Sequence, residues 1–404
     1  MAITELQAPQ TRTPAFNDML HVINSTNKNQ TNFKYIFKVY VNGTYIGKSF
    51  KVAPDSVHGF GLFDAKRIIG TYVTYDLDLS VVGATRNSNN NDYYSIQYGE
   101  EYGDLSSGVT SYNNLAESST IYAYAGSFRT LDFISYVDDT YIMDSSGSLF
   151  MTNQPRPFRI FEDQYAWLGA MDDTIQHMDE YRVLTYNISG TLLNTFRINN
   201  GFRNDFFIKI ITGWNLNSID SSEFNGGGSQ PILTSSVYYY TVQMYDGNNP
   251  ISELFRFNCD SSCEWDTGGS YDVYFLNALG WFDSIRFNRL NTKSHEINAK
   301  YYKQSTGSFG ASSFDVAKTD RAKTQYYTSY TDKWKLRSAY LTEAESTWLL
   351  ELVTSPQVFI NVNSELIPCT ITQSNYDERK RSEGQIFNLE IDVEFSVKNY
   401  RQRF

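Results

Sequence analysis

The chain has 404 residues, of which 41% are hydrophobic and 16% aromatic, a composition typical of globular domains rather than of disordered chains. At about 100–200 residues per domain, this length predicts roughly two to four domains. The 31 Tyr and 27 Phe favour strands over helices. The formal net charge of −11 argues against a nucleic-acid-binding protein, because such proteins need basic surface to displace counterions.

The charge is distributed unevenly along the chain. Residues 1–285 hold 17 Lys and Arg against 31 Asp and Glu, a balance of −14. Residues 286–404 hold 17 against 14, a balance of +3. An acidic front and a slightly basic rear would help subunits to stack head to tail, and chance drift of charge between domains explains the difference equally well.

Targeting and redox signals are sparse. The N-terminus lacks a basic segment followed by an apolar run, and no stretch approaches the ~18 apolar residues of a membrane span. The sequence therefore predicts a protein that folds in the cytoplasm, where it is made. Its three cysteines are too few for a disulfide scaffold, and we expect reduced thiols. They are Cys259, Cys263 and Cys369.

Composition and proline positions predict an arm followed by three β domains. Residues 1–32 are polar and rich in Asn and Thr, and we interpret them as an arm that stays loose until a neighbour orders it. Two prolines close to residue 155 mark a boundary. The predicted units are an N-terminal β domain at 33–154, a middle β domain at 155–265, and a C-terminal β domain at 266–404 that contains a helix at 342–354.

Period-two alternation and turn residues predict several hairpins. Residues 33–41 and 44–52 flank Asn42 and Gly43, a pair that supplies the two positive φ angles of a type I′ turn. Two further hairpins are predicted for 181–187 with 191–198 around Ser189-Gly190, and for 237–245 with 251–257 around Asp246-Gly247. Residues 221–230 contain three successive glycines and are interpreted as a flexible loop.

The C-terminal domain carries one helix signal and one long strand signal. Thr342 and Glu345 have capping-box spacing, and Pro356 stops the helix soon afterwards. Its predicted apolar face comprises Ala344, Trp348, Leu349 and Leu352. In the strand that follows, we expect one face to be buried, formed by Phe387, Leu389, Ile391, Val393, Phe395 and Val397. The opposite, wet face is formed by Asn388, Glu390, Asp392 and Glu394.

No motif for catalysis, for cofactor binding or for metal binding is present in the sequence. GxGxxG, GxxxxGK[ST], GxSxG and HExxH are all absent, and no two histidines among His21, His58, His177 and His295 pair with each other. Cys259 and Cys263 would need two further ligands to form a zinc site. We therefore predict no catalytic, cofactor-binding or metal residues and no enzyme activity.

Two sets of residues leave alternatives open. Glycoside hydrolysis needs two carboxylates across a cleft, whereas adjacent acids on a strand point to opposite faces, so we favour solvated loop acids. The acids concerned are Asp138-Asp139, Asp172-Asp173 and Glu100-Glu101. Strand aromatics such as Tyr35 and Phe37 are assigned to the core. Loop aromatics could serve subunit interfaces or stack on sugars, or they could equally fill a core, and they are Trp167, Trp214, Trp265 and Trp281.

Three blocks of sequence resemble tail or baseplate proteins of tailed bacteriophages that infect Bacteroidetes-type bacteria. The first is FKYIFKVYVNGTYIGKSFKV with the later GFGLFD. The second is YTVQMYDGNNPISELFRFNC with YDVYFLNALGWFDSIRFN. The third is LTEAESTWLLELVTSPQVFI with ELIPCTITQSNYDERKRSEGQIFNLEIDVEF. The resemblance implies assembly into a ring or tube end, and it brings no catalytic residues with it.

Together these observations predict a mainly β protein with two or three antiparallel β-sandwich-like domains and one short C-terminal helix. The function we expect is that of a virion structural protein of a phage tail (distal tail, baseplate or connector ring). It would assemble as a ring of its own copies with other tail proteins. The alternative is a tail-fibre module that binds a receptor or a host surface glycan. We expect the arm 1–32 and the loop 221–230 to join subunits, so that deleting residues 1–30 would leave a folded monomer.

Overall fold

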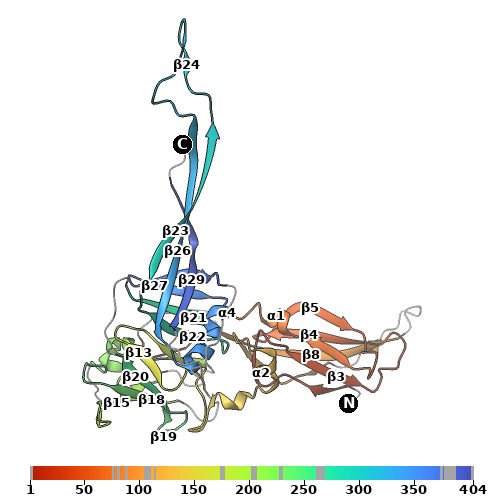
Figure 1. Ribbon diagram of the computed structural model, residues 1–404. Helices are drawn as coiled ribbons and strands as arrows, with labels where there is room; N and C mark the ends of the chain where they lie inside the picture. The colour runs from red at the N-terminus through yellow and green to blue at the C-terminus, as the bar shows by residue number, and fades with distance from the viewer. Residues whose placement is uncertain are drawn as a thin grey trace. The chain divides into compact units, whose positions relative to one another are not determined.

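The computed structural model is mainly β (Figure 1), which confirms the predicted fold class. The chain separates into two compact units. The first unit comprises residues 1–261 and 276–283, and the second comprises residues 262–275 and 284–404. The structure describes residues 3–74, 77, 79, 82–86, 90–103, 111–112, 115–172, 178–201, 207–226, 231–260, 269–373, 376 and 388–401.

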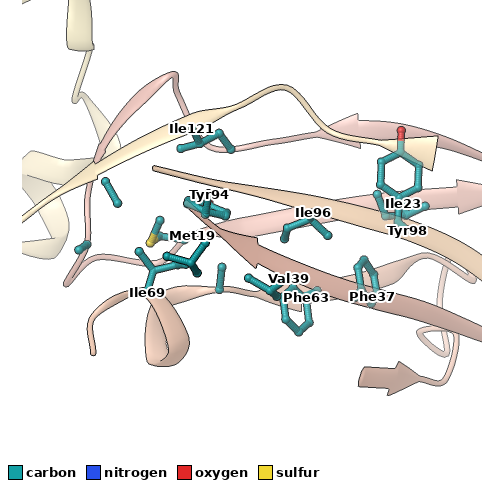
Figure 2. Packing of buried hydrophobic residues seen from close by; sticks show 14 of the residues in the cluster. Met19, Ile23, Phe37, Val39, Phe63, Ile69, Tyr94, Ile96, Tyr98 and Ile121 are labelled. Carbon is teal, nitrogen blue, oxygen red and sulfur yellow. The ribbon is translucent and has the colours of Figure 1, made fainter. Parts of the chain in front are cut away.

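The N-terminal part of the first unit contains two sheets around one core. The smaller sheet has the order β1–β3–β6, with bounds Ile3–Gln7, Leu20–Ser25 and Gly61–Asp64. The larger has the order β2–β11–β8–β4–β5, with bounds Arg12–Pro14, Ile121–Tyr124, Asn91–Tyr102, Lys34–Val41 and Thr44–Val52. Figure 2 shows Ile23 and Phe63 of the smaller sheet in one cluster with Phe37 and Ile96 of the larger one.

The predicted first hairpin is confirmed as β4 and β5. Asn42 and Gly43 have φ angles of 50° and 71°, as a type I′ turn requires. Tyr35 and Phe37 are fully buried, which confirms their assignment to the core. The hairpin at 181–198 is likewise confirmed as β15 (Glu180–Tyr186) and β16 (Leu192–Asn199).

The interpretation of residues 1–32 as a loose arm is wrong for the described residues 3–32. These residues form β1, β2 and β3, and β2 pairs in parallel with β11. Ala15, Met19 and Ile23 are fully buried in the core cluster. The polar composition was misleading because the buried apolar residues are few, and Ala15 and Met19 lie between β2 and β3, where no strand alternation reveals them.

A tight loop between β5 and β6 is organised by one carboxylate. The Oδ1 atom of Asp55 accepts hydrogen bonds from the backbone N–H groups of Val57 (2.8 Å) and His58 (3.0 Å), and Oδ2 accepts one from Phe60 (2.7 Å). The bonds from His58, Phe60 and Val57 stabilise the charged form and lower the pKa of Asp55 to about 2.

This loop should open at strongly acidic pH. Because the pKa of Asp55 is depressed from 3.8 on folding, its stabilising effect is complete above pH 3.8 and is lost as pH falls through about 2. We expect the amide resonances of Val57, His58 and Phe60 to move together with a midpoint close to pH 2. An Asp55→Asn variant is the control and should show no such transition. A midpoint close to 4 would contradict the hydrogen-bonded carboxylate.

The remaining strands of the first unit form two more sheets. One has the order β12–β14–β17–β7, with bounds Ile142–Met143, Trp167–Asp172, Phe207–Ile211 and Ala84–Arg86. The other has the order β13–β20–β18–β15–β16, and its first three strands span Phe158–Phe161, Phe255–Asp260 and Tyr239–Asp246. Strand β19 (Asn249–Pro250) pairs with β18, in line with the hairpin predicted around Asp246-Gly247.

The predicted boundary at residue 155 is not a clean division. Strand β7 lies in the range 33–154 but pairs with β17, and β12 pairs with β14. Pairing between segments far apart in the chain therefore joins the two predicted domains. Two prolines close to residue 155 carry no information about such long-range pairing.

Of the predicted flexible loop 221–230, residues 221–226 are ordered by a short 3-10 helix, η3 (Ser221–Glu223), and by the buried Phe224. Residues 227–230 lie outside the described part.

The second unit is built on one seven-stranded sheet with the order β22–β21–β27–β28–β29–β26–β23, of which residue 276 of β21 and residues 282–283 of β22 belong to the first unit. The bounds are Phe282–Phe287, Tyr271–Leu276, Val358–Val362, Glu365–Ile371, Asn388–Tyr400, Lys323–Tyr340 and Thr292–Lys303. A buried ion pair between Asp272 and Arg286, at 2.7 and 3.0 Å, links β21 to β22. All sheet neighbours whose register is described in this unit run antiparallel.

The predicted C-terminal helix is confirmed as α3 (Glu343–Trp348) and α4 (Leu350–Thr354). Thr342 and Glu345 form the expected capping box, and Trp348 packs against Phe275 at 5.4 Å between ring centroids. Trp348, Leu349 and Leu352 are buried as predicted. Ala344 is exposed, so its place on the apolar face was wrong.

The long C-terminal strand is confirmed in its first half. Its inward residues Leu389, Ile391, Val393 and Phe395 are buried. Val397 is 57% exposed, contrary to expectation, because the sheet no longer has a core beneath it at that point. Phe387 lies outside the described residues.

Candidate interaction site on an exposed β arm

The most distinctive surface of the second unit is a long hairpin that the sequence did not predict. Strand β26 has 18 residues and β23 has 12, and they pair from Thr292 with Lys335 to Lys303 with Lys323. We call residues 297–328 the β arm. Figure 1 shows it extending beyond the sheet to the small hairpin of β24 (Ser308–Phe309) and β25 (Phe314–Asp315).

The β arm is a two-stranded ribbon for most of its length. On its other side β26 pairs with β29 only as far as Ser329 opposite Tyr400, with one further backbone hydrogen bond from Arg401 to Thr328. Beyond that point β23 is its only partner in the described chain. A two-stranded ribbon without a covering layer is at best marginally stable in water. The stability of the outer arm therefore depends on contact with a covering surface.

Apolar side chains are exposed along the β arm. Phe309 is 85% exposed, Ile297 68% and Val316 61%. Further exposed aromatics on the arm are Tyr301, Tyr302, Phe314 and Tyr326. Single exposed apolar residues are common on protein surfaces, but a concentration of this kind on one narrow element marks an interaction surface.

The β arm is also basic, in a chain whose net charge is −11. It holds five cationic side chains against Asp315 and Asp320, a balance of +3. The cations are Lys300, Lys303, Lys318, Arg321 and Lys323. The Nζ of Lys323 lies 4.0 Å from the ring centroid of Tyr301, which places a cation against an exposed aromatic ring.

The base of the arm is anchored on both faces of the sheet. On one face Lys333 of β26 lies 2.5 Å from Glu296 of β23 and 3.2 Å from Glu394 of β29. Hydrogen bonds to Glu296 and Glu394 raise the pKa of Lys333. On the other face Trp334 packs against Phe395, with 4.7 Å between ring centroids. The sheet thus holds the base of the arm in place and leaves its outer part uncovered.

The acidic pairs considered as catalytic candidates have separate contacts within the first unit. Glu100 is buried and accepts hydrogen bonds from Ser25 and from Asn27, the latter at 2.6 Å. Its neighbour Glu101 forms a 2.5 Å ion pair with Lys51 of a different strand. The two carboxylates therefore point apart, as strand geometry requires.

The other two pairs also hold backbone in place. Asp138 accepts a hydrogen bond from the N–H of Arg12 at 3.0 Å, and the buried Asp172 accepts one from Met178 at 3.1 Å. Asp139 is exposed. Asp173 lies outside the described residues.

Two of the three loop tryptophans that lie within the described residues are in the core. Trp167 and Trp281 are buried, and Trp281 packs so closely on Gly169 that an added Cβ there would lie 2.2 Å from its ring. Trp214 is half-buried. Trp265 lies outside the described residues. For these two buried side chains the core alternative holds and the interface alternative is wrong, because β14 and the turn before β22 place them inside the first unit.

The described residues contain no group of three or more His, Cys, Asp or Glu side chains placed to hold a metal ion. Burial raises the pKa of the Cys259 thiol and of the Cys369 thiol to about 12, and both thiols are free. Cys263 and His177 lie outside the described residues. Within the described ranges, no helix combines the length and the hydropathy that crossing a membrane requires.

In its described residues, the chain is a mainly β protein of several sheets with one projecting ribbon. Neither a protein-family model nor a curated protein matches the chain. Several solved structures show slight similarity, two of them as follows. The full extracellular region of Plexin A4 is 8% identical, with a TM-score of 0.17 over 97% of this chain and 31% of that one. The BSP domain of a biofilm associated protein is 10% identical, with a TM-score of 0.16 over 83% of this chain and 63% of that one.

The chain therefore spans less than a third of the plexin region and less than two thirds of the biofilm protein. At such TM-scores neither similarity bears on the fold or on the function.

Proposed function

We propose that this chain is a virion structural protein of a bacteriophage tail, in the distal tail, the baseplate or a connector ring, and that it assembles in multiple copies. The observation that carries the assembly part of this proposal is the uncovered β arm, with Phe309 85% exposed at its tip. The phage context rests on the three sequence blocks that resemble tail and baseplate proteins.

A need for partners follows from the energetics of the arm. Burying the exposed apolar side chains of the ribbon against another surface gains roughly 25 cal/mol for each Å² removed from water. The same contact gives the two-stranded ribbon the covering layer that it lacks. Assembly therefore stabilises the arm and joins subunits at the same time, which suits a part that is made as a monomer and acts in a particle.

The arm fits a protein partner better than a glycan. A sugar-binding platform presents aromatic rings with their faces free and nearly coplanar. On the arm the rings of Tyr302 and Tyr326 are inclined by 48°, and those of Phe309 and Phe314 by 63°. A glycan array on the isolated protein separates the two functions, and we expect no selective hit.

The direct test is to look for the chain in particles and for its oligomer in solution. We expect mass spectrometry of purified virions of the phage that encodes it to detect the chain in multiple copies. We also expect light scattering and negative-stain microscopy of the purified protein to show closed oligomers at micromolar concentration. Absence of the chain from the virion would end the tail assignment, and a monomer at every concentration would end self-assembly.

A further inference from the structure

A second exposed apolar surface lies on the first unit. Helix α2 (Thr130–Ile134) directs Phe133 inward, where it packs on a core cluster together with Tyr136. On the outside, Leu131 is 80% exposed and Ile134 77% exposed, and their i, i+3 spacing makes them neighbours on one helix face. Val137, also exposed, follows at the same spacing. We call residues 130–139 the α2 patch.

The α2 patch is acidic. It contains Asp132, Asp138 and Asp139 and no Lys or Arg, a balance of −3. Asp132 and Asp139 are exposed, whereas Asp138 is half-buried and accepts the hydrogen bond from the N–H of Arg12. The nearest cation in the sequence, Arg129, lies 4.0 Å from Asp132. Asp132 and Asp139 are therefore the two acids best placed to meet a partner.

The β arm and the α2 patch are complementary in two independent respects. Each exposes apolar side chains that fold into no core of their own unit, and their charges are +3 and −3. A basic apolar ribbon and an acidic apolar helix face attract each other at long range and bury apolar area on contact. The polar rim fixes orientation, while the apolar centre supplies affinity.

We propose that the β arm of one copy docks on the α2 patch of the next copy. This inference rests on the proposed self-assembly and specifies its interface. Because donor and acceptor surfaces differ, the contact is heterologous, and repetition of one such contact generates a ring when the rotation closes or a helical stack when it does not. Every subunit then contributes one arm and receives one.

A charge-swap experiment tests this pairing on the full chain. The arm variant is Lys300→Glu with Lys303→Glu, and the patch variant is Asp132→Lys with Asp139→Lys. Asp138 is left unchanged because it holds the Arg12 backbone. All four side chains are exposed, so folding should be unaffected, which circular dichroism and thermal melting check. The matched control for the arm variant is Lys34→Glu with Lys48→Glu, which makes the same charge change of −4 on exposed lysines elsewhere.

We expect each variant alone to weaken association by about tenfold or more, measured by light scattering across a dilution series, because like charges then face each other across the interface. Mixing the arm variant with the patch variant should restore association between the two. In the mixture the altered arm, now negative, meets the altered patch, now positive, so the charges are reversed but again complementary. A chain carrying both changes should recover oligomers, and the control should match the wild type.

Four outcomes overturn the inference. If both variants assemble as the wild type does, or if the combined variant fails to recover, the arm and the patch are not partners, and the proposed self-assembly stands through another interface. If the control loses association to the same degree, net charge rather than this contact is responsible. A wild-type chain that remains monomeric at every concentration removes the self-assembly itself, and the inference with it.

Discussion

Removal of the outer β arm should leave a folded chain that no longer self-associates. The variant replaces residues 300–327 by Asn-Gly, which joins Ala299 to Thr328, two residues that face each other in the register of β23 and β26. Asn-Gly is the preferred two-residue connection for such a pair. The contacts of Trp334 and the ion pairs of Lys333 lie below the cut and stay intact.

We expect the thermal midpoint of this variant to change little, because the deleted residues contribute no buried side chain to the sheet. Association should fall by about a hundredfold or more, since the anchors of an interface carry most of its binding energy. Light scattering and analytical ultracentrifugation measure the association, and circular dichroism checks the fold.

A polar arm of full length is the matched control for this deletion. In it, Ile297→Thr, Phe309→Ser and Val316→Ser keep the length and charge of the arm and remove its most exposed apolar side chains. If apolar burial drives assembly, this variant also stays monomeric. A deletion variant that still forms native oligomers would show that the arm has no part in self-assembly.

Removal of residues 1–30 should unfold the N-terminal sheets of the first unit. Strand β3 is the centre of the sheet β1–β3–β6, and β2 forms the edge next to β11. The deletion exposes the partners of Met19 and Ile23, leaves β6 without its sheet neighbour, and removes the acceptor of the Tyr136 hydroxyl at the Arg12 carbonyl. We expect an insoluble or protease-sensitive product.

A single substitution measures the same dependence without deleting a strand. Ile23→Ala removes a fully buried side chain and should cost about 2–5 kcal/mol of the free energy of unfolding. Leu6→Ala on the neighbouring strand β1 is the matched control, and since Leu6 is 53% exposed it should cost less than about 0.5 kcal/mol. Urea denaturation monitors both. The deletion itself is checked by circular dichroism and thermal melting. If the chain without residues 1–30 keeps the native spectrum and the native melting curve, the removed segment is a dispensable arm and this prediction is wrong.

The two deletions are expected to have effects opposite to those that composition suggests for residues 1–32 and for the β arm. The polar N-terminal segment is part of the core, and the segment 297–328, which carried no clear signal, is the exposed one. Subunit contact is therefore to be sought in the β arm and not in residues 1–32.

Local rules determined much of the secondary structure. Asn42 and Gly43 specify their turn because both require positive φ, and Thr342 with Glu345 specifies a helix start because the two side chains satisfy free backbone N–H groups. Leu389, Ile391 and Val393 specify a half-buried strand by alternation alone. Each of these signals lies within a few neighbouring residues, and so the sequence by itself was sufficient.

Only the tertiary structure decided which segments pair across long stretches of chain and which surfaces remain uncovered. The pairing of β2 with β11 joins segments more than 100 residues apart, and no local pattern encodes it. Strand β23 shows no alternation because neither of its faces is buried, so the rule that found β29 could not find it. Whether Trp281 or Ile297 meets water depends on what other segments cover it, and that is a property of the folded chain as a whole.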